Sequence, residues 1–403
     1  MRTHVPTLMG ALFLAFFAIF PFVYSAGDYD YIMHIFIIGF FYAILASSWS
    51  MLAGYAGQFS FGHMGFMGIG SYTTALLLQY IRFSPEPTNL CTEFEIGGTW
   101  LIVVNPIGVT STTLSQSCID QALAIWDGAV TVTGVPVWAG IILGTIMGGI
   151  AGLLIGLLVL RLRAAYLALF TLGFAEIVKA TISAEIEITR GQAGLETPAL
   201  FENGITLFGR FYSRTDKLPP YFVMFFLLLT CLAILWWLSR SKFGLFVRAL
   251  REDQEAAAAL GVNTTRYKVL VFVVTTMMAA SAGAVQAHYV GIVTPNNLFL
   301  LQMSLVVAMA VIGGVENFVA AAIGAIVIQF VLEMLRNSFT IGPVTIDMTV
   351  WRLVIFGILL MVTLRFTRNG LIAPIIEYFQ RGHVGAETVA KRSAGSGEAG
   401  AAK

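Results

Sequence analysis

Long apolar runs constrain this chain more than any other feature of its sequence. A helix needs about 20 mostly apolar residues to cross a bilayer. Backbone groups find no water in lipid, so such runs must be helical, and they are too long for the alternating strands of a membrane barrel. We expect an all-α polytopic membrane protein in the lipid bilayer with about ten transmembrane helices. They are predicted at Thr7–Ser25, Tyr31–Ala53, Gly62–Ile81, Val137–Leu160, Ala164–Ser183, Pro220–Leu238, Tyr267–Tyr289, Leu300–Ile312, Phe318–Leu335 and Val350–Arg365.

The composition supports this class. Of 403 residues, 58% are hydrophobic and 11% are charged, whereas soluble proteins carry about 25% charged residues. A net charge of +1 provides no basic field, so no nucleic-acid partner is expected. The eighth and ninth runs are short and could instead form one broken helix pair.

Charge predicts the orientation. The segment Ser239–Arg266 is the most basic loop, and Arg161 and Arg163 lie in a short connection, so both are expected on the cytoplasmic side. The long loops Arg82–Pro136 and Ala184–Pro219 then lie outside, and both termini are cytoplasmic. The alternative for the first run is a cleaved signal peptide ending near Ser25.

The outer loop holds two of the three cysteines. Cys91 and Cys118 lie there, where an oxidising compartment would allow a disulfide, while two free thiols are the alternative. Trp100–Val104 and Val130–Val132 are β-prone, which predicts a small extracytoplasmic loop subdomain. Closing a loop of this length would add roughly 3–4 kcal/mol on the chain-entropy estimate.

No motif for enzyme chemistry is present. The chain has no Gly-Lys pair and hence no Walker A loop, no His-Glu-x-x-His and no Cys-x-x-Cys, and its five histidines are scattered. We therefore expect a protein that is not an enzyme, with no catalytic residue, metal or cofactor site of its own.

A glycine-rich stretch suggests a broken helix. Gly54–Gly70 holds six glycines together with Gln58, Ser60 and His63. Small residues can simply allow membrane helices to pack closely. Polar side chains are awkward in a lipid-facing helix, so we favour a broken segment that lines a polar path.

The basic loop contains a helix-forming segment, Arg248–Gly261, which reads RALREDQEAAAALG. Ala, Leu, Glu and Arg favour a helix, and Gly261 is a natural end. Arg251 and Glu255 lie four residues apart and should share one face. A helix this short needs a surface to pack against, either lipid headgroups or a soluble partner.

Several motifs together resemble one transporter family. Glu255-Ala256-Ala257 followed by Gly261 resembles the E-A-A-x-x-x-G pattern of ABC-importer permeases. The longer stretch is similar to permeases for branched-chain amino acids of the LivM and LivH type. The same resemblance extends from about Ile44 to Leu371 through Gly54–His63, Thr171–Ile177, Thr189–Leu195, Ile312–Gly314 and Arg368–Leu371.

The resemblance implies the function. The chain would be the LivM-type permease subunit of an importer in the bacterial plasma (inner) membrane. Its partners would be a second, LivH-like permease subunit, cytoplasmic ATPase subunits that bind ATP-Mg, and an extracytoplasmic substrate-binding protein for leucine, isoleucine or valine. Residues 1–366 would form the permease domain, 84–135 an extracytoplasmic insertion, 239–266 the cytoplasmic coupling loop and 367–403 a partly disordered cytoplasmic tail.

The resemblance also implies site residues. Those expected to couple to the ATPase are Arg251, Asp253, Glu255, Ala256, Ala257 and Gly261. Those expected along the translocation path are Gly57, Ser60, His63, Thr171, Gly173 and Glu176. The outer loop is longer than the family's pattern, and Arg190 and Gln192 depart from it.

Three other functions remain open from the residues. An ABC permease for urea or short amides would look similar. An ion-coupled secondary transporter would need a buried ionisable residue, for which Glu176 is the best candidate and Glu316 and Glu333 follow. Glu176 could instead pair with Lys179, three residues on. A passive channel for a small amide is the third possibility.

Overall fold

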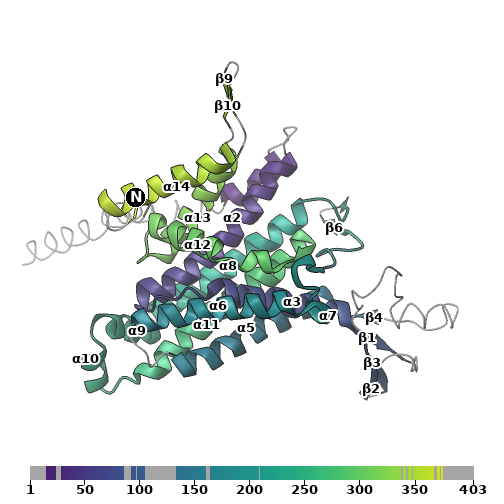
Figure 1. Cartoon of the computed structure of the whole chain (residues 1–403), viewed down its shortest axis with the longest axis horizontal. Helices are drawn as coiled ribbons and strands as arrows, with labels where there is room; N and C mark the ends of the chain where they lie inside the picture. The colour runs from purple at the N-terminus through teal and green to yellow at the C-terminus, as the bar shows by residue number, and fades with distance from the viewer. Residues whose placement is uncertain are drawn as a thin grey trace, which may run out of the picture.

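The computed structural model describes residues 15–23, 29–85, 92–96, 98–104, 133–159, 164–207, 209–336, 339–341, 344–346, 348–366, 370–372 and 374. Several long helices run between two ends of the molecule (Figure 1). They are α2 (Tyr29–Ser50), α3 (His63–Tyr80), α5 (Val137–Val159), α6 (Ala164–Ala184), α8 (Leu218–Arg240) and α11 (Thr264–Val290). Residues 15–23 form a further helical segment.

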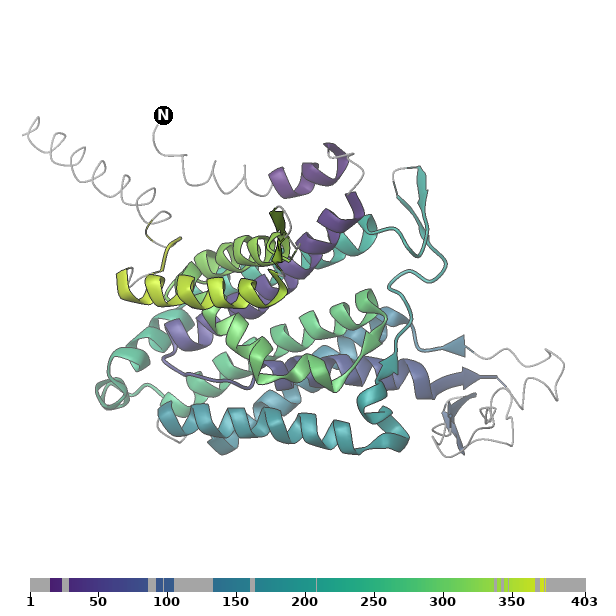
Figure 2. The same ribbon diagram turned by 45° about the horizontal axis from the view of Figure 1, so that its top comes forward.

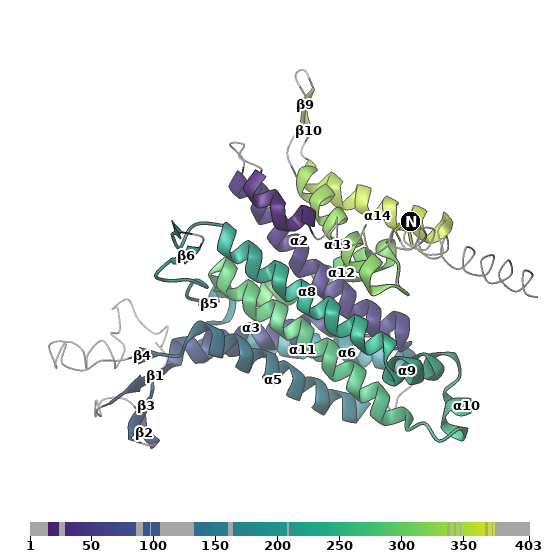
Figure 3. The ribbon, with the colours of Figure 1, turned by 180° about the vertical axis from the view of Figure 1, so that it is seen from behind.

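The two ends differ in what they carry. One end, called here the α10 end, holds α9 (Lys242–Glu252) and α10 (Gln254–Ala259). The other, called the sheet end, holds the strands β1–β4 and the short helix α7 (Ile186–Thr189) (Figures 1 and 3). The loop 239–266, predicted to be cytoplasmic, therefore lies at the α10 end. The described parts of the loops 82–136 and 184–219, predicted to be outside, lie at the sheet end.

A second group of helices packs on the other side of α2. It consists of α12 (Leu300–Gly313), α13 (Phe318–Met334) and α14 (Met348–Phe366). The first two are bent by 117° at a short break. The two short runs therefore form the broken pair that the sequence left open.

The structure bears out part of the span prediction. Among the described residues, five helices are long and apolar enough to cross a membrane, or six if the bent pair is one span. The prediction of a helical, multi-pass membrane protein is thus confirmed, and the count of ten stays a prediction.

Closely packed helices form the centre of the molecule. The side chains of α2 and α11 are the most buried of the five apolar helices, and α11 packs against α5, α3 and α2. A Cβ atom at Gly70 would lie 2.7 Å from the Ala280 carbonyl carbon, and one at Gly283 would lie 2.7 Å from Met67 Cγ. Small residues at these crossings let the backbones approach, which is how helices associate in lipid.

The prediction of one helix over Arg248–Gly261 is wrong in one respect, because the structure has two helices there, α9 and α10. Asp253 between α9 and α10 is extended, with φ −151° and ψ 108°, and its carboxylate accepts hydrogen bonds from the backbone N–H groups of Glu255 and Ala256. An aspartate that caps a new helix in this way competes with continuation of the old one. Arg251 and Glu255 therefore do not share a helix face.

A small sheet lies at the end of α3. The strands β1 (Ile81–Ser84), β2 (Thr92–Ile96), β3 (Thr99–Val103) and β4 (Thr133–Gly134) are arranged in the order β2-β3-β1-β4, with Ile81 opposite Val103 and Arg82 opposite Gly134. Figure 2 shows this sheet projecting beyond the helices. The strand β3 confirms the β-prone stretch Trp100–Val104. Val130–Val132, Cys91 and Cys118 lie outside the described residues, so the disulfide and the complete subdomain stay predictions.

Shorter elements complete the chain. Gly191–Ala193 (η2) and Pro295–Leu298 (η3) are 3-10 helices, and Met51–Tyr55 (η1) is a π-helix. The antiparallel strand pairs are β5 (Leu195–Glu196) with β8 (Ile292–Val293), β6 (Ile205–Leu207) with β7 (Arg210–Tyr212), and β9 (Phe339–Ile341) with β10 (Val344–Ile346).

Candidate functional site

Arg251 joins three separate segments at the α10 end. Its guanidinium, at the end of α9, donates to the backbone oxygen of Gly54 in η1 and pairs with the carboxylate of Glu316 in the turn between α12 and α13. Arginine can make such paired, charge-assisted bonds because its N–H groups form a rigid fork. The loop that is expected to contact an ATPase is thus tied to both breaks in the helices. We call Arg251, Gly54 and Glu316 the arginine junction.

Glycine makes the junction possible. A Cβ atom at Gly54 would lie 2.7 Å from the Val315 carbonyl carbon, so only glycine lets η1 approach the α12–α13 turn. Ser50 closes the same contact by donating to the Val315 oxygen at 2.6 Å. Gly57 has φ +65°, and its Cβ would lie 3.3 Å from Arg251 Cγ. Gly57 therefore lies beside the arginine junction, and its place along the translocation path stays a prediction.

The helix α10 has well-defined ends. Asp253 caps its start, with its carboxylate 2.9 Å from Glu255 N and 3.0 Å from Ala256 N. Gly261 has φ +84°, and the N–H groups of Gly261 and Val262 donate to the oxygens of Ala258 and Ala257. These two bonds form a Schellman motif, which confirms Gly261 as the helix end.

One face of α10 contacts the bundle and the rest is open. Ala257 is buried, whereas Glu255 and Ala256 are exposed. Leu260 is 86% exposed, a large apolar side chain that the described residues leave uncovered. Lys268 of α11 donates to Gln254 at 2.6 Å and holds the start of the helix. The helix therefore presents a small, mostly alanine surface to whatever lies beyond the α10 end.

The connection from η1 to α3 buries polar groups. Ser60 is buried, its backbone oxygen accepts from Trp49 Nε1 at 2.8 Å, and its hydroxyl accepts from Gly62 N at 3.2 Å. The side chains of Gln58 and His63 are buried and have no hydrogen-bond partner within the described part of the chain. Buried polar groups are normally bonded, so this connection is chemically unusual for a helix bundle.

The predicted residues of α6 divide between its two faces. Thr171 is buried against the connection, where its hydroxyl accepts from Phe61 N at 3.0 Å and donates to the Leu167 oxygen at 3.0 Å. The structure thus brings Thr171 to the segment that holds Ser60 and His63. Gly173 has nothing within 4 Å of the position of a Cβ atom. Glu176 pairs with Lys179 at 2.7 Å, which confirms the predicted pairing.

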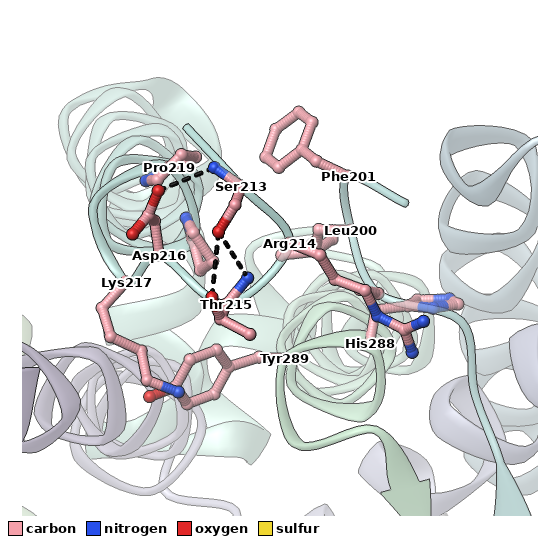
Figure 4. Close-up of a pocket in the computed structure, with 12 residues that line it drawn as sticks. Leu200, Phe201, Ser213, Arg214, Thr215, Asp216, Lys217, Pro219, His288 and Tyr289 are labelled. Carbon is pink, nitrogen blue, oxygen red and sulfur yellow. Dashed lines mark hydrogen bonds between the residues drawn. The ribbon is translucent and has the colours of Figure 1, made fainter. Parts of the chain in front are cut away.

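A polar pocket at the sheet end was missed from sequence. Figure 4 shows Lys217, Tyr289 and His288 around it, with the loop Ser213–Asp216 across its rim. Asp216 accepts from Ser213 N at 2.7 Å, and Lys217 Nζ lies 5.2 Å from the centre of the Tyr289 ring.

His288 lines this pocket and is held by two polar contacts. Its Nδ1 lies 2.8 Å from the Pro198 oxygen and its Nε2 lies 2.8 Å from Thr74 Oγ1. Because a carbonyl oxygen only accepts, Nδ1 carries the proton and Nε2 accepts from the threonine. The contact joins α3, α11 and the 195–200 segment. No sequence spacing pointed to it, since Thr74 and His288 are far apart in the chain.

Arg82 lies at the junction of α3 and the sheet. It donates to the Ile81 oxygen at 3.1 Å and to the Leu78 oxygen. Burial lowers the pKa of its guanidinium, and the charge of Glu202 acts in the opposite direction. No group of three His, Cys, Asp or Glu side chains that could hold a metal occurs within the residues described above.

Comparisons with known proteins agree on a family. The profile described as "Branched-chain amino acid transport system / permease component" matches residues 31–364. The chain is 29% identical over 367 residues to the high-affinity branched-chain amino acid transport permease LivM of Salmonella typhimurium, covering 86% of this chain and 73% of that protein. It is 28% identical over 354 residues to LivM of Escherichia coli K12, covering 82% and 70%.

The second permease of these systems matches too. The chain is 24% identical over 304 residues to LivH of Salmonella typhimurium, covering 75% of this chain and 83% of that protein. No solved structure matches the chain.

Proposed function

The chain belongs to the permease family of branched-chain amino acid transport systems, and we propose that it is the LivM-type subunit of an ATP-driven ABC importer for leucine, isoleucine and valine. The observation that carries the proposal is the family match over residues 31–364. The exposed helix α10 supports it, because an importer needs a docking element for an ATPase. ATP-Mg would bind on the partner subunits, and this chain would supply transport without its own catalysis.

The proposed orientation follows from the charges. The basic α10 end would face the cytoplasm of a bacterial inner membrane, with both termini on that side. The sheet end would face outward and receive the substrate-binding protein. The polar pocket of Lys217, Tyr289 and His288 lies at that end, where a binding protein would release its cargo.

The arginine junction suggests how ATPase motion would reach the membrane. Movement of α10 would pull on Arg251, which bonds Gly54 in η1 and Glu316 beside the bent pair. Both contacts are at helix breaks, where the backbone can change angle without disrupting a continuous helix. Alternating access would then open and close a path beside Ser60, His63 and Thr171.

Reconstitution tests the function directly. The complete complex in liposomes, with binding protein outside and ATP inside, should accumulate labelled leucine. Omission of the ATPase subunits should abolish accumulation. Uptake that continues without them would contradict the proposal and favour a channel or an ion-coupled carrier.

Uptake of urea and acetamide distinguishes the second candidate function, an ABC permease for short amides, from a leucine importer. The same motifs resemble such permeases. An amide importer would accumulate labelled urea or acetamide and ignore leucine. A protonophore that stops uptake while ATP is present would instead favour the ion-coupled carrier.

A further inference from the structure

The helix α6 has two different faces. Leu167, Thr171 and Ala175 are buried. Gly62, just before α3, and Gly65 within it approach this face closely enough that a Cβ at either would lie 3.2 Å from Thr171 or Ala175. The opposite face is open. Its exposed residues recur every three or four positions and are Tyr166, Leu169, Phe170 and Ile177, and the half-buried Gly173 lies among them with nothing within 4 Å of its Cβ position. Of the five apolar helices, α6 is the least buried.

This open face is chemically unlike that of α5. The exposed side chains in the middle of α5 are aliphatic or methionine, and no charged residue occurs between Val137 and Val159. Such a surface suits lipid tails. On α6, by contrast, Glu176 and Lys179 form an ion pair in which the Glu176 side chain is 42% exposed.

The depth of the pair makes lipid contact costly. Glu176 is twelve residues after Ala164, about 18 Å along a helix that rises 1.5 Å per residue, so it lies near the middle of a roughly 30 Å hydrocarbon layer. A charged side chain at that depth is costly in lipid, and such residues almost always face protein or a water-filled cavity instead. Lys179 does not extend away toward water, because its Nζ lies 4.4 Å from the centre of the Phe299 ring.

We infer that the open face of α6 packs against the second, LivH-type permease subunit, with the carboxylate of Glu176 at the seam between the two. This rests on the proposed function. The LivH-type protein matches 75% of this chain, so it is expected to have the same fold. Two subunits of one fold pair readily about an approximate twofold axis, each using the same element. Gly173 at the centre of the face would let a facing helix approach closely.

Photocrosslinking within the assembled complex tests the interface. A benzoylphenylalanine at Phe170 or Ile177 should give an adduct of this chain with the LivH-type subunit on illumination in native membranes. The same probe at Leu154 of α5 or Met361 of α14, which are 58% and 71% exposed, should give no such adduct. Adducts with lipid alone at 170 and 177, or with a second copy of this chain, would overturn the inference.

A steric variant gives an independent test. Gly173→Trp should reduce co-purification of the LivH-type subunit at least tenfold. Gly357→Trp is the matched control, because Gly357 of α14 is also a helix glycine with nothing near its Cβ position, and co-purification should be kept. If Gly173→Trp fails to insert, the photocrosslinks decide alone.

The two proposals fail differently. Leucine uptake by the wild-type complex together with lipid-only adducts at 170 and 177 would remove the interface and leave the importer intact. Absence of ATP-driven leucine uptake, with the LivH-type adduct present, would remove the importer function and leave the interface.

Discussion

At the residue scale, Arg251 is expected to couple two events that can be measured separately. Arg251→Gln removes the bonds to Gly54 and Glu316. The bond to the Gly54 oxygen is worth about 1.5–3 kcal/mol, whereas the ion pair with the exposed Glu316 adds about 1 kcal/mol or less. We expect leucine uptake to fall at least tenfold while ATP hydrolysis by the complex persists, because the ATPase no longer moves the helix breaks. Arg240→Gln, whose guanidinium lies over Trp236, should leave both rates unchanged.

The charge-swapped pair sharpens this test. Arg251→Glu with Glu316→Arg restores an ion pair but sets a carboxylate against the Gly54 oxygen, which can only accept. Partial rescue of uptake relative to either single variant is expected. Full uptake by Arg251→Gln would show that the junction plays no part in coupling.

Glu255 and Gly261 define the second prediction at this scale. Proline at 261 cannot adopt φ +84° and lacks the N–H that donates to Ala258. The double variant Glu255→Lys with Gly261→Pro should insert normally and lose ATP-driven uptake, because both the surface charge and the end of α10 change. Glu252→Lys reverses a neighbouring exposed charge on α9 and should retain most uptake. Normal uptake by a well-expressed double variant would contradict a docking role for α10.

At the scale of elements, the glycine crossings should govern stability. Gly70→Val would drive a side chain into the Ala280 backbone at the α3–α11 crossing, and such overpacking costs about 1–3 kcal/mol or more. We expect a clear drop in the thermal midpoint of the detergent-purified protein. Gly357→Val changes the same residue type where nothing is within 4 Å, so its midpoint should not move. Equal midpoints for the two variants would contradict the packing argument.

The elements also explain what the sequence could predict. Apolar length and the need to satisfy backbone groups locate the helices from Tyr31 onward, and a glycine at the end of an alanine run predicts the end of α10. The break at Asp253 was missed because helix propensity alone favours continuity, whereas one capping carboxylate decides it. The arginine junction could not be predicted, since Arg251 and Glu316 meet only through the packing of α9, η1 and the bent pair.

At the scale of the whole molecule, the two ends should lie on opposite sides of the membrane. Leu260 lies at the α10 end and is 86% exposed, and Phe211 lies at the sheet end and is 62% exposed. An impermeant thiol reagent applied to intact cells should label Phe211→Cys, and should label Leu260→Cys only after the membrane is permeabilised. Cys231 is buried and provides little background.

The same labelling decides the fate of the outer cysteines. If Cys91 and Cys118 form the predicted disulfide, the wild-type chain should resist the reagent from outside until it is reduced, and should then gain two labels by mass spectrometry. Labelling of both without prior reduction would show free thiols and leave the orientation standing. Labelling of Leu260→Cys in intact cells, with protection of Phe211→Cys, would show that the orientation in the membrane is the reverse of the one proposed. It would place α10 away from any cytoplasmic ATPase, and the importer mechanism argued from that helix would fail with it.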